Sequence, residues 1–205
     1  MDTGIVRCGI FLAALIGTAG QAALADVTCG WHFNELDGAS TRLSADHGSG
    51  VLDLAVIEES VTIYEGTSLN ALKDDPAGTA LGIRGLDANQ KWIELSGSAE
   101  GPVELGFAFR ATPSGFDDNQ LQLLIGGAWT TIDSFGGSQA DGAWHQKTIV
   151  IPEQSGPFRL RFFVDGAESS SGTIRFDNLR VTPISAPSAL LACGTGCVVL
   201  RPRRN

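Results

Sequence analysis

The residue types that most often carry chemistry are sparse in this sequence. Three histidines, His32, His47 and His145, are isolated, and none belongs to a His-x-x-x-His or His-Glu-x-x-His pattern that would place two metal ligands on one helical face. No Gly-x-Ser-x-Gly elbow and no glycine-rich phosphate-binding loop occurs. The sequence therefore predicts neither a catalytic zinc site, nor a serine hydrolase, nor a nucleotide cofactor, and we expect a protein that is not an enzyme.

Asp177 is the strongest candidate for a metal ligand. It lies between two pairs of apolar residues. Ile174 and Phe176 are two positions apart, as are Leu179 and Val181, but Phe176 and Leu179 are three positions apart. This spacing predicts a β-bulge at Asp177-Asn178, which would return both pairs to the core. A carboxylate at a bulge can complete an oxygen shell for a structural calcium ion, or it can simply accept hydrogen bonds from the local backbone. The backbone role is the interpretation we favour, so we expect no cofactor, and a structural calcium ion at Asp177 is the alternative.

Trp92 is the candidate for ligand binding. In the segment 91–96, strand alternation that buries Ile93 and Leu95 directs Trp92 outward together with Glu94. An exposed tryptophan on a sheet provides a stacking platform for a sugar ring, whereas an inverted strand or a covering loop would bury it. The other three tryptophans are expected in the core. They are Trp31, Trp129 and Trp144.

The elements that must position these residues are predicted to be strands. Alternation is clearest over 102–110, where Val103, Leu105, Phe107 and Phe109 share one face, and it recurs over 158–164 and 119–125. Weaker candidates cover 51–57, 61–65, 80–84, 92–95, 129–132 and 147–151. Gly126-Gly127 suits a tight hairpin between 119–125 and 128–132, because glycine adopts the positive φ angles of primed turns. We expect an all-β fold, an antiparallel β-sandwich resembling a jelly roll, over residues 26–185.

The two ends of the chain differ from this middle. Residues 1–25 contain Arg7, an apolar stretch and the small-x-small segment Ala23-Leu24-Ala25. This pattern predicts a signal peptide whose apolar stretch is helical and which is cleaved after Ala25. A buried N-terminal helix is the alternative. Residues 186–205 begin with Ala186-Pro187-Ser188, continue as an apolar run to Leu200 and end in arginines. That run forms at most a short hydrophobic helix, since it falls short of the roughly 20 residues that span a bilayer. The alternative is a helix packed on the domain.

The tail resembles the PEP-CTERM class of bacterial sorting signals, in which a proline-containing tripeptide, a hydrophobic segment and an arginine-rich end are recognised by a protease embedded in the membrane. Here the tripeptide is Ala186-Pro187-Ser188. The middle also looks like the jelly-roll passenger domains found ahead of such tails, through the segments 64–72, 115–122 and 171–179. The resemblance implies transient contact with the membrane and its sorting protease, and a destination at the cell surface or in the extracellular matrix.

Charge narrows the range of partners. The chain has a net charge of -9, and because four of its arginines lie in the ends, residues 26–185 carry 10 Lys and Arg against 22 Asp and Glu. Such an acidic body repels phosphate backbones, so we expect no nucleic-acid partner. The leading hypothesis is an exported, non-enzymatic surface or matrix protein. Its alternative is a carbohydrate-binding module for exopolysaccharide, stabilised by calcium if Asp177 binds that ion.

Overall fold

The computed structural model describes residues 27–72 and 75–184. The predicted signal peptide with Ala25, and the predicted tail with Ala186, Pro187 and Ser188, lie outside these described residues. Within them, no helix is long and apolar enough to cross a membrane.

The described chain is all-β, and every strand pairing in it is antiparallel. The strands are β1 (Cys29–Trp31), β2 (Arg42–Ser44), β3 (His47–Gly48), β4 (Gly50–Asp53), β5 (Val61–Glu65), β6 (Thr79–Arg84), β7 (Lys91–Ala111), β8 (Asp118–Ile125), β9 (Ala128–Gly136), β10 (His145–Val164) and β11 (Thr173–Pro183). Three single-turn 3₁₀ helices cover Glu58–Ser60, Leu86–Ala88 and Gly137–Gln139. The expected antiparallel β-sandwich is confirmed.

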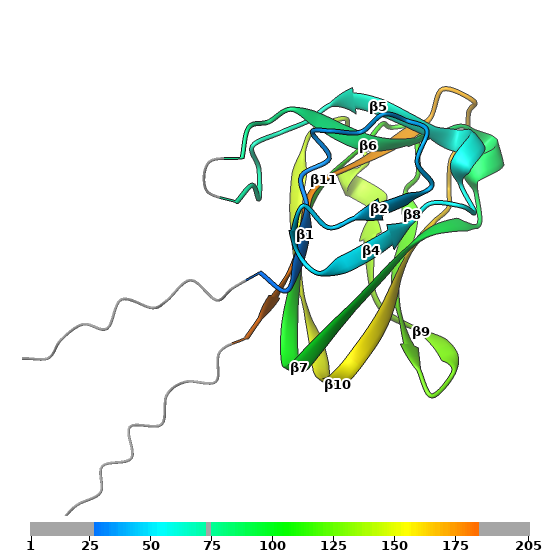
Figure 1. Ribbon diagram of the computed structural model, residues 1–205. Helices are drawn as coiled ribbons and strands as arrows, with labels where there is room; N and C mark the ends of the chain where they lie inside the picture. Colours follow the sequence, from blue (N-terminus) through cyan, green and yellow to red (C-terminus); the bar gives the residue numbers. More distant parts are fainter. Residues whose placement is uncertain (1–26, 73–74, 185–205) are drawn as a thin grey trace, which may run out of the picture.

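Two long strands, β7 and β10, run through both layers of the sandwich (Figure 1). Residues 103–111 of β7 pair with β11 and with 145–151 of β10, and β11 continues to β1 and β6; this is the first layer. Residues 91–97 of β7 pair with β4 and with 158–164 of β10, which continues to β8 and β9; this is the second layer. A single sheet therefore folds back on itself, and its inward faces form one core.

A cluster of phenylalanines joins the two layers. Phe107 of the first layer lies 5.2 Å from Phe162 and 5.3 Å from Phe135 of the second, measured between ring centroids, with the rings edge to face. Phe176 of β11 packs 5.4 Å from Phe162. Phe107, Phe162 and Phe176 are almost fully buried. Edge-to-face packing of this kind adds to the stabilisation that burial of the aromatic surface already provides.

The predicted bulge and the predicted hairpin are both confirmed. The pairing of β11 with β7 shifts between Asp177 and Arg180, which places one extra residue in β11, and Phe176 and Leu179 are both buried. Asn178 takes the positive φ of 48° that the bulge requires. In the hairpin, Ile125 pairs with Ala128 across two glycines whose φ angles are 58° and 86°.

The structure differs from the expected elements in three places. The segments 92–95 and 102–110 are parts of β7, and 147–151 and 158–164 are parts of β10, because pairing continues through the bends where apolar alternation stops. Between the two parts, the register of β10 against β7 shifts between Ile151 and Gln154, opposite residues 101–103 of β7. The strand expected at 51–57 ends at Asp53. The short strands β1, β2 and β3 have too few residues to show a period.

Candidate functional site: a polar and aromatic sheet face

The outer surface of the second layer presents a row of polar and aromatic side chains. Ile93 and Leu95 of β7 are buried, whereas Trp92 and Glu94 are half-buried and lie on the opposite side of the strand, as expected from the sequence. The register aligns further polar residues across three more strands, and these share the face of Glu94. They are Arg161 of β10, Gln122 of β8 and Thr131 of β9.

Arg161 lies between two tryptophan rings. Its guanidinium carbon is 4.1 Å from the centroid of the Trp92 ring and 3.9 Å from that of Trp129. A planar cation over the face of an indole is attracted by the negative charge of the π system, and the planar guanidinium also stacks. Trp92, Arg161 and Trp129 thus form one stack that spans β7, β10 and β9, and we call it the Trp-Arg-Trp stack.

Glu94 holds the two arginines of this face in position. Its carboxylate accepts a hydrogen bond from Arg159 Nε at 2.6 Å and one from Arg161 Nε at 3.4 Å. Because Arg159 is half exposed, this ion pair contributes little to stability and mainly orients the guanidinium groups. Arg159 also lies 5.7 Å from the Trp129 ring.

Side-chain amides extend the polar row beside the stack. Gln120 Oε1 accepts hydrogen bonds from Thr131 Oγ1 at 2.8 Å and from Gln122 Nε2 at 3.2 Å. Ser96 continues the outer face of β7 toward an open groove of about 560 Å³, which short side chains line, among them Ser44, Ser49 and Ser98. The face therefore offers aromatic rings and planar hydrogen-bonding groups next to an open groove lined by short side chains.

The expectation that Trp129 packs in the core was wrong. Trp129 is half-buried on the outer face. Trp144 is also half-buried, so the same expectation fails there, whereas Trp31 is a core residue at 2% exposure. The hairpin contains the signal that sequence reasoning missed. The turn pairs Trp129 with Leu124, and Leu124 must point outward once Leu123 points inward.

Asp177 lies elsewhere, at the bulge in the first layer. Its buried carboxylate accepts hydrogen bonds from the backbone N–H groups of Thr67 at 2.6 Å and Asn178 at 2.8 Å. Burial raises the pKa of this carboxyl to about 7, against the opposing effect of these two hydrogen bonds. The contacts match the backbone role, while calcium binding at Asp177 stays a prediction.

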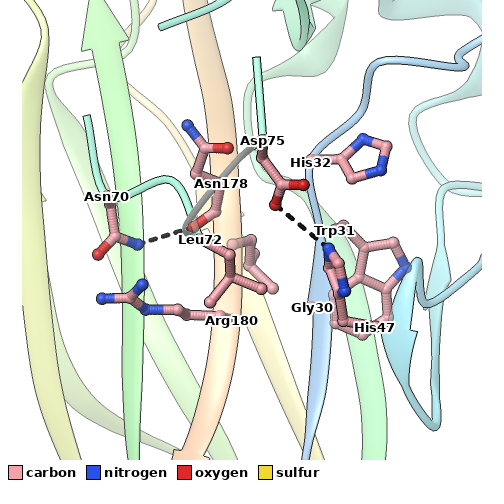
Figure 2. A pocket seen from close by; sticks show the side chains of 10 residues that line it. Gly30, Trp31, His32, His47, Asn70, Leu72, Asp75, Asn178 and Arg180 are labelled. Carbon is pink, nitrogen blue, oxygen red and sulfur yellow. Dashed lines mark hydrogen bonds and ion pairs between the residues drawn. The ribbon is translucent and has the colours of Figure 1, made fainter. Parts of the chain in front are cut away.

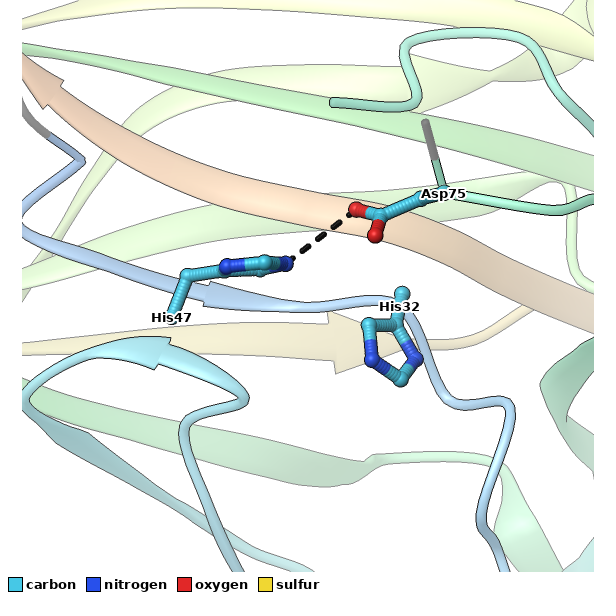
Figure 3. Close-up of side chains that lie close together, drawn as sticks. All are labelled: His32, His47 and Asp75. Carbon is cyan, nitrogen blue, oxygen red and sulfur yellow. Dashed lines mark hydrogen bonds and ion pairs between the residues drawn. The ribbon is translucent and has the colours of Figure 1, made fainter. Parts of the chain in front are cut away.

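A second polar cluster brings together two histidines that the sequence leaves 15 positions apart. His32, His47 and Asp75 each place one potential metal-ligating atom within 4.8 Å of the others (Figure 3). They line one small cavity of the first layer, together with Asn70, Asn178 and Arg180 (Figure 2). Sequence reasoning missed this cluster because β1 and β3 are too short to predict. His145 pairs instead with Asp141, at 2.9 Å.

Two further features of the described chain are a free cysteine, Cys29, and a second aromatic side chain stacked by an arginine, Tyr64. Cys29 is a buried free thiol, and burial raises its pKa to about 12, so it is not a ready nucleophile. Tyr64 of the first layer is stacked by Arg175, whose guanidinium carbon lies 3.9 Å from the ring centroid. This pair reproduces the aromatic and arginine stacking of the candidate face on the other layer.

The comparisons with known proteins concern the fold. A search of protein-family models finds no match, and a search of curated proteins also finds none. Among solved structures, the chain is similar to the CBM22-1 xylan-binding domain of Xyn10C from Paenibacillus barcinonensis, at 15% identity and a TM-score of 0.46, covering 81% of this chain and 99% of that one. It is also similar to the K3 cleaved adhesin domain of Lys-gingipain from Porphyromonas gingivalis, at 14% identity and a TM-score of 0.40, covering 62% and 92%. At these identities and TM-scores the likenesses do not determine what this chain binds.

Proposed function

We propose that the protein is a non-enzymatic carbohydrate-binding module that binds polysaccharide on the outer face of its second layer. The observation that carries this proposal is the Trp-Arg-Trp stack on a sheet face. A pyranose ring presents an apolar C–H surface that packs against the electron-rich face of an indole. Its hydroxyl groups need partners that both donate and accept, which the side-chain amides of Gln120 and Gln122 supply, and Arg159 and Arg161 add further donors.

The geometry favours binding over catalysis on this face. Hydrolysis of a glycosidic bond requires two carboxyl groups on opposite sides of the scissile bond, one of them able to transfer a proton. Glu94 is instead held between Arg159 and Arg161, an arrangement that fixes the direction of the guanidinium groups. It therefore acts as a positioning residue, and the arginines and tryptophans provide the contact surface.

The proposed location follows from the ends of the sequence. Export through residues 1–25 with cleavage after Ala25, and sorting through the tail that begins at Ala186-Pro187-Ser188, would deliver the domain to the cell surface or the extracellular matrix. Exopolysaccharide at this location is the ligand that we propose. The support for this route is the pattern of the sequence and the resemblance of the tail.

The test is affinity electrophoresis in gels that contain soluble polysaccharides, with Trp92→Ala, Trp129→Ala and the double variant. Stacking on one indole contributes about 0.5–1.5 kcal/mol, so each single variant should bind roughly 2- to 10-fold more weakly. Tyr64→Ala is the matched control, because it removes an arginine-stacked aromatic from the other layer. Unchanged retention of the double variant, or loss of retention in Tyr64→Ala alone, would overturn the proposal.

A further inference from the structure

We propose that His32, His47 and Asp75 bind a divalent transition-metal ion of the Zn²⁺ type, which links Asp75 to the chain at strands β1 and β3. The three side chains come from three separate parts of the chain, and their potential ligating atoms lie within 4.8 Å of one another. They line a cavity of about 10 Å³, which is room for one water-sized occupant. This site lies in the first layer and is independent of the polysaccharide face.

The distances fit a four-coordinate ion. With Zn–N and Zn–O bonds of about 2.0–2.1 Å, tetrahedral ligand atoms are about 3.3 Å apart and the centroids of two ligating imidazoles about 5 Å apart. His47 Nε2 and Asp75 Oδ2 are already 3.2 Å apart. The His32 and His47 rings have centroids 5.8 Å apart and planes at 72°. The three ligating atoms lie within 4.8 Å of one another, so a movement of His32 of up to about 1.5 Å brings them to tetrahedral spacing, and water can fill the fourth position.

The backbone places the two histidines on one side of a strand pair. His47 of β3 pairs with Gly30 of β1, so His32, two residues further along, is its diagonal neighbour. Asp46 supports the His32 ring: its carboxylate accepts a hydrogen bond from the His32 backbone N–H at 2.8 Å and lies 3.5 Å from Nδ1. In this structure His32 Nδ1 accepts a hydrogen bond from the backbone N–H of Asn34 at 3.1 Å, which leaves the proton of a neutral ring on Nε2. Binding of the ion through Nε2 therefore requires the ring to exchange this bond for one from Nδ1–H to the Asp46 carboxylate, which would then orient the ligating imidazole.

Asp75 is brought to the histidines by a segment that is held at both ends. At its start, Asn178 Nδ2 donates hydrogen bonds to the backbone oxygens of Thr67 at 2.6 Å and Leu69 at 3.0 Å. At its end, Asn34 Nδ2 donates to Pro76 O at 3.2 Å, and Asn34 Oδ1 accepts from Thr79 N at 2.9 Å. The bulge thus holds Thr67 and Leu69, and the chain directly after His32 holds Pro76 and Thr79 next to Asp75.

The ligand types and the solvent access of the cluster favour Zn²⁺ or a similar transition-metal ion over Ca²⁺ or Mg²⁺. Two imidazoles and one carboxylate suit Zn²⁺ and its transition-metal neighbours, whereas Ca²⁺ and Mg²⁺ prefer six or more oxygen ligands. The carboxylates of Asp75 and Asp46 outweigh the single positive charge of Arg180 in the same cavity. His47 is 39% exposed, so an ion can reach the cluster from solvent.

The test is isothermal titration of the chelator-treated, desalted protein with ZnCl₂, together with thermal unfolding with and without the ion. We expect one Zn²⁺ per chain and a higher unfolding temperature with Zn²⁺. His47→Ala and Asp75→Asn should each lower the affinity at least about 10-fold, since each removes one of three ligands. Millimolar Ca²⁺ or Mg²⁺ should not displace Zn²⁺.

Two controls make the result decisive. His145→Ala removes the third histidine, which lies outside the cluster, and should leave the affinity unchanged. The Trp92→Ala, Trp129→Ala double variant should also bind Zn²⁺ normally, so that this proposal and the polysaccharide proposal fail separately. His47→Gln, a substitution at a partly exposed position, guards against loss of fold. Absence of Zn²⁺ binding, or equal loss in His145→Ala and His47→Ala, would refute the site.

Discussion

At the scale of single residues, Asp177 is a buried carboxylate that links two distant parts of the backbone through hydrogen bonds. Its carboxylate is fully buried yet accepts two backbone N–H groups, one of them 110 positions away at Thr67. Those bonds tie the start of the segment 66–78 to the bulge. The cost is the removal of a carboxylate from water, which is why its pKa rises to about 7.

This raised pKa predicts a specific dependence of stability on pH. In the unfolded chain an aspartate ionises near pH 3.9, so between about pH 4 and 7 the folded state binds more protons than the unfolded state. Asp177 therefore lowers the free energy of unfolding as the pH rises through that window and has no further effect above it. Asp177→Asn removes this contribution.

Urea denaturation of the wild type and of Asp177→Asn at pH 4, 5.5 and 7.5 measures the effect, and the other titrating groups cancel in the difference. The stability of the wild type relative to the variant should decrease as the pH rises. Parallel pH curves for the two proteins would show that the carboxyl is not perturbed.

At the scale of elements, the sequence was informative where a strand is long or a turn has a strict requirement. The bulge followed from the spacing of Phe176 and Leu179, and the hairpin from Gly126-Gly127. The joining of separate runs into β7 and β10 did not follow, because residues 97–101 of β7 carry no apolar alternation and are held in the strand by pairing with 154–158 of β10. The outward direction of Trp92 was predictable from strand alternation. The outward direction of Trp129 could have been inferred only from its pairing with Leu124 across the predicted hairpin.

The hairpin allows backbone conformation to be tested apart from packing. Gly126 has a φ of 58°, and a β-carbon added there would meet nothing within 4 Å. Gly126→Asn should leave stability within about 0.5 kcal/mol of the wild type, because asparagine tolerates this conformation in primed turns, whereas Gly126→Val should cost about 1–2 kcal/mol. Thermal unfolding checks both values. Equal stabilities of the two variants would mean that the turn does not retain its positive φ.

At the scale of the whole molecule, the phenylalanine cluster makes the two layers one cooperative unit. Phe107 contacts aromatic rings of both layers, so Phe107→Ala should lower the free energy of unfolding by about 3–5 kcal/mol. Val150→Ala, at a side chain that is 61% exposed, should change it by less than about 0.5 kcal/mol. Near- and far-ultraviolet circular dichroism should report one transition in urea. A loss below 1 kcal/mol in Phe107→Ala would place the core elsewhere.

The salt dependence of binding distinguishes polysaccharide binding by stacking on the tryptophans from binding driven by the charge of the arginines. The chain has a net charge of -9, but Arg159 and Arg161 outnumber Glu94 on the candidate face. Stacking and hydrogen bonding to a neutral polysaccharide release no counterions, so its affinity should change less than about 2-fold between roughly 0.05 and 0.5 M NaCl. A uronate-containing polymer that uses both arginines should instead bind more weakly as salt is added. If the neutral polymer shows the steep salt dependence, the arginines rather than the tryptophans supply most of the affinity.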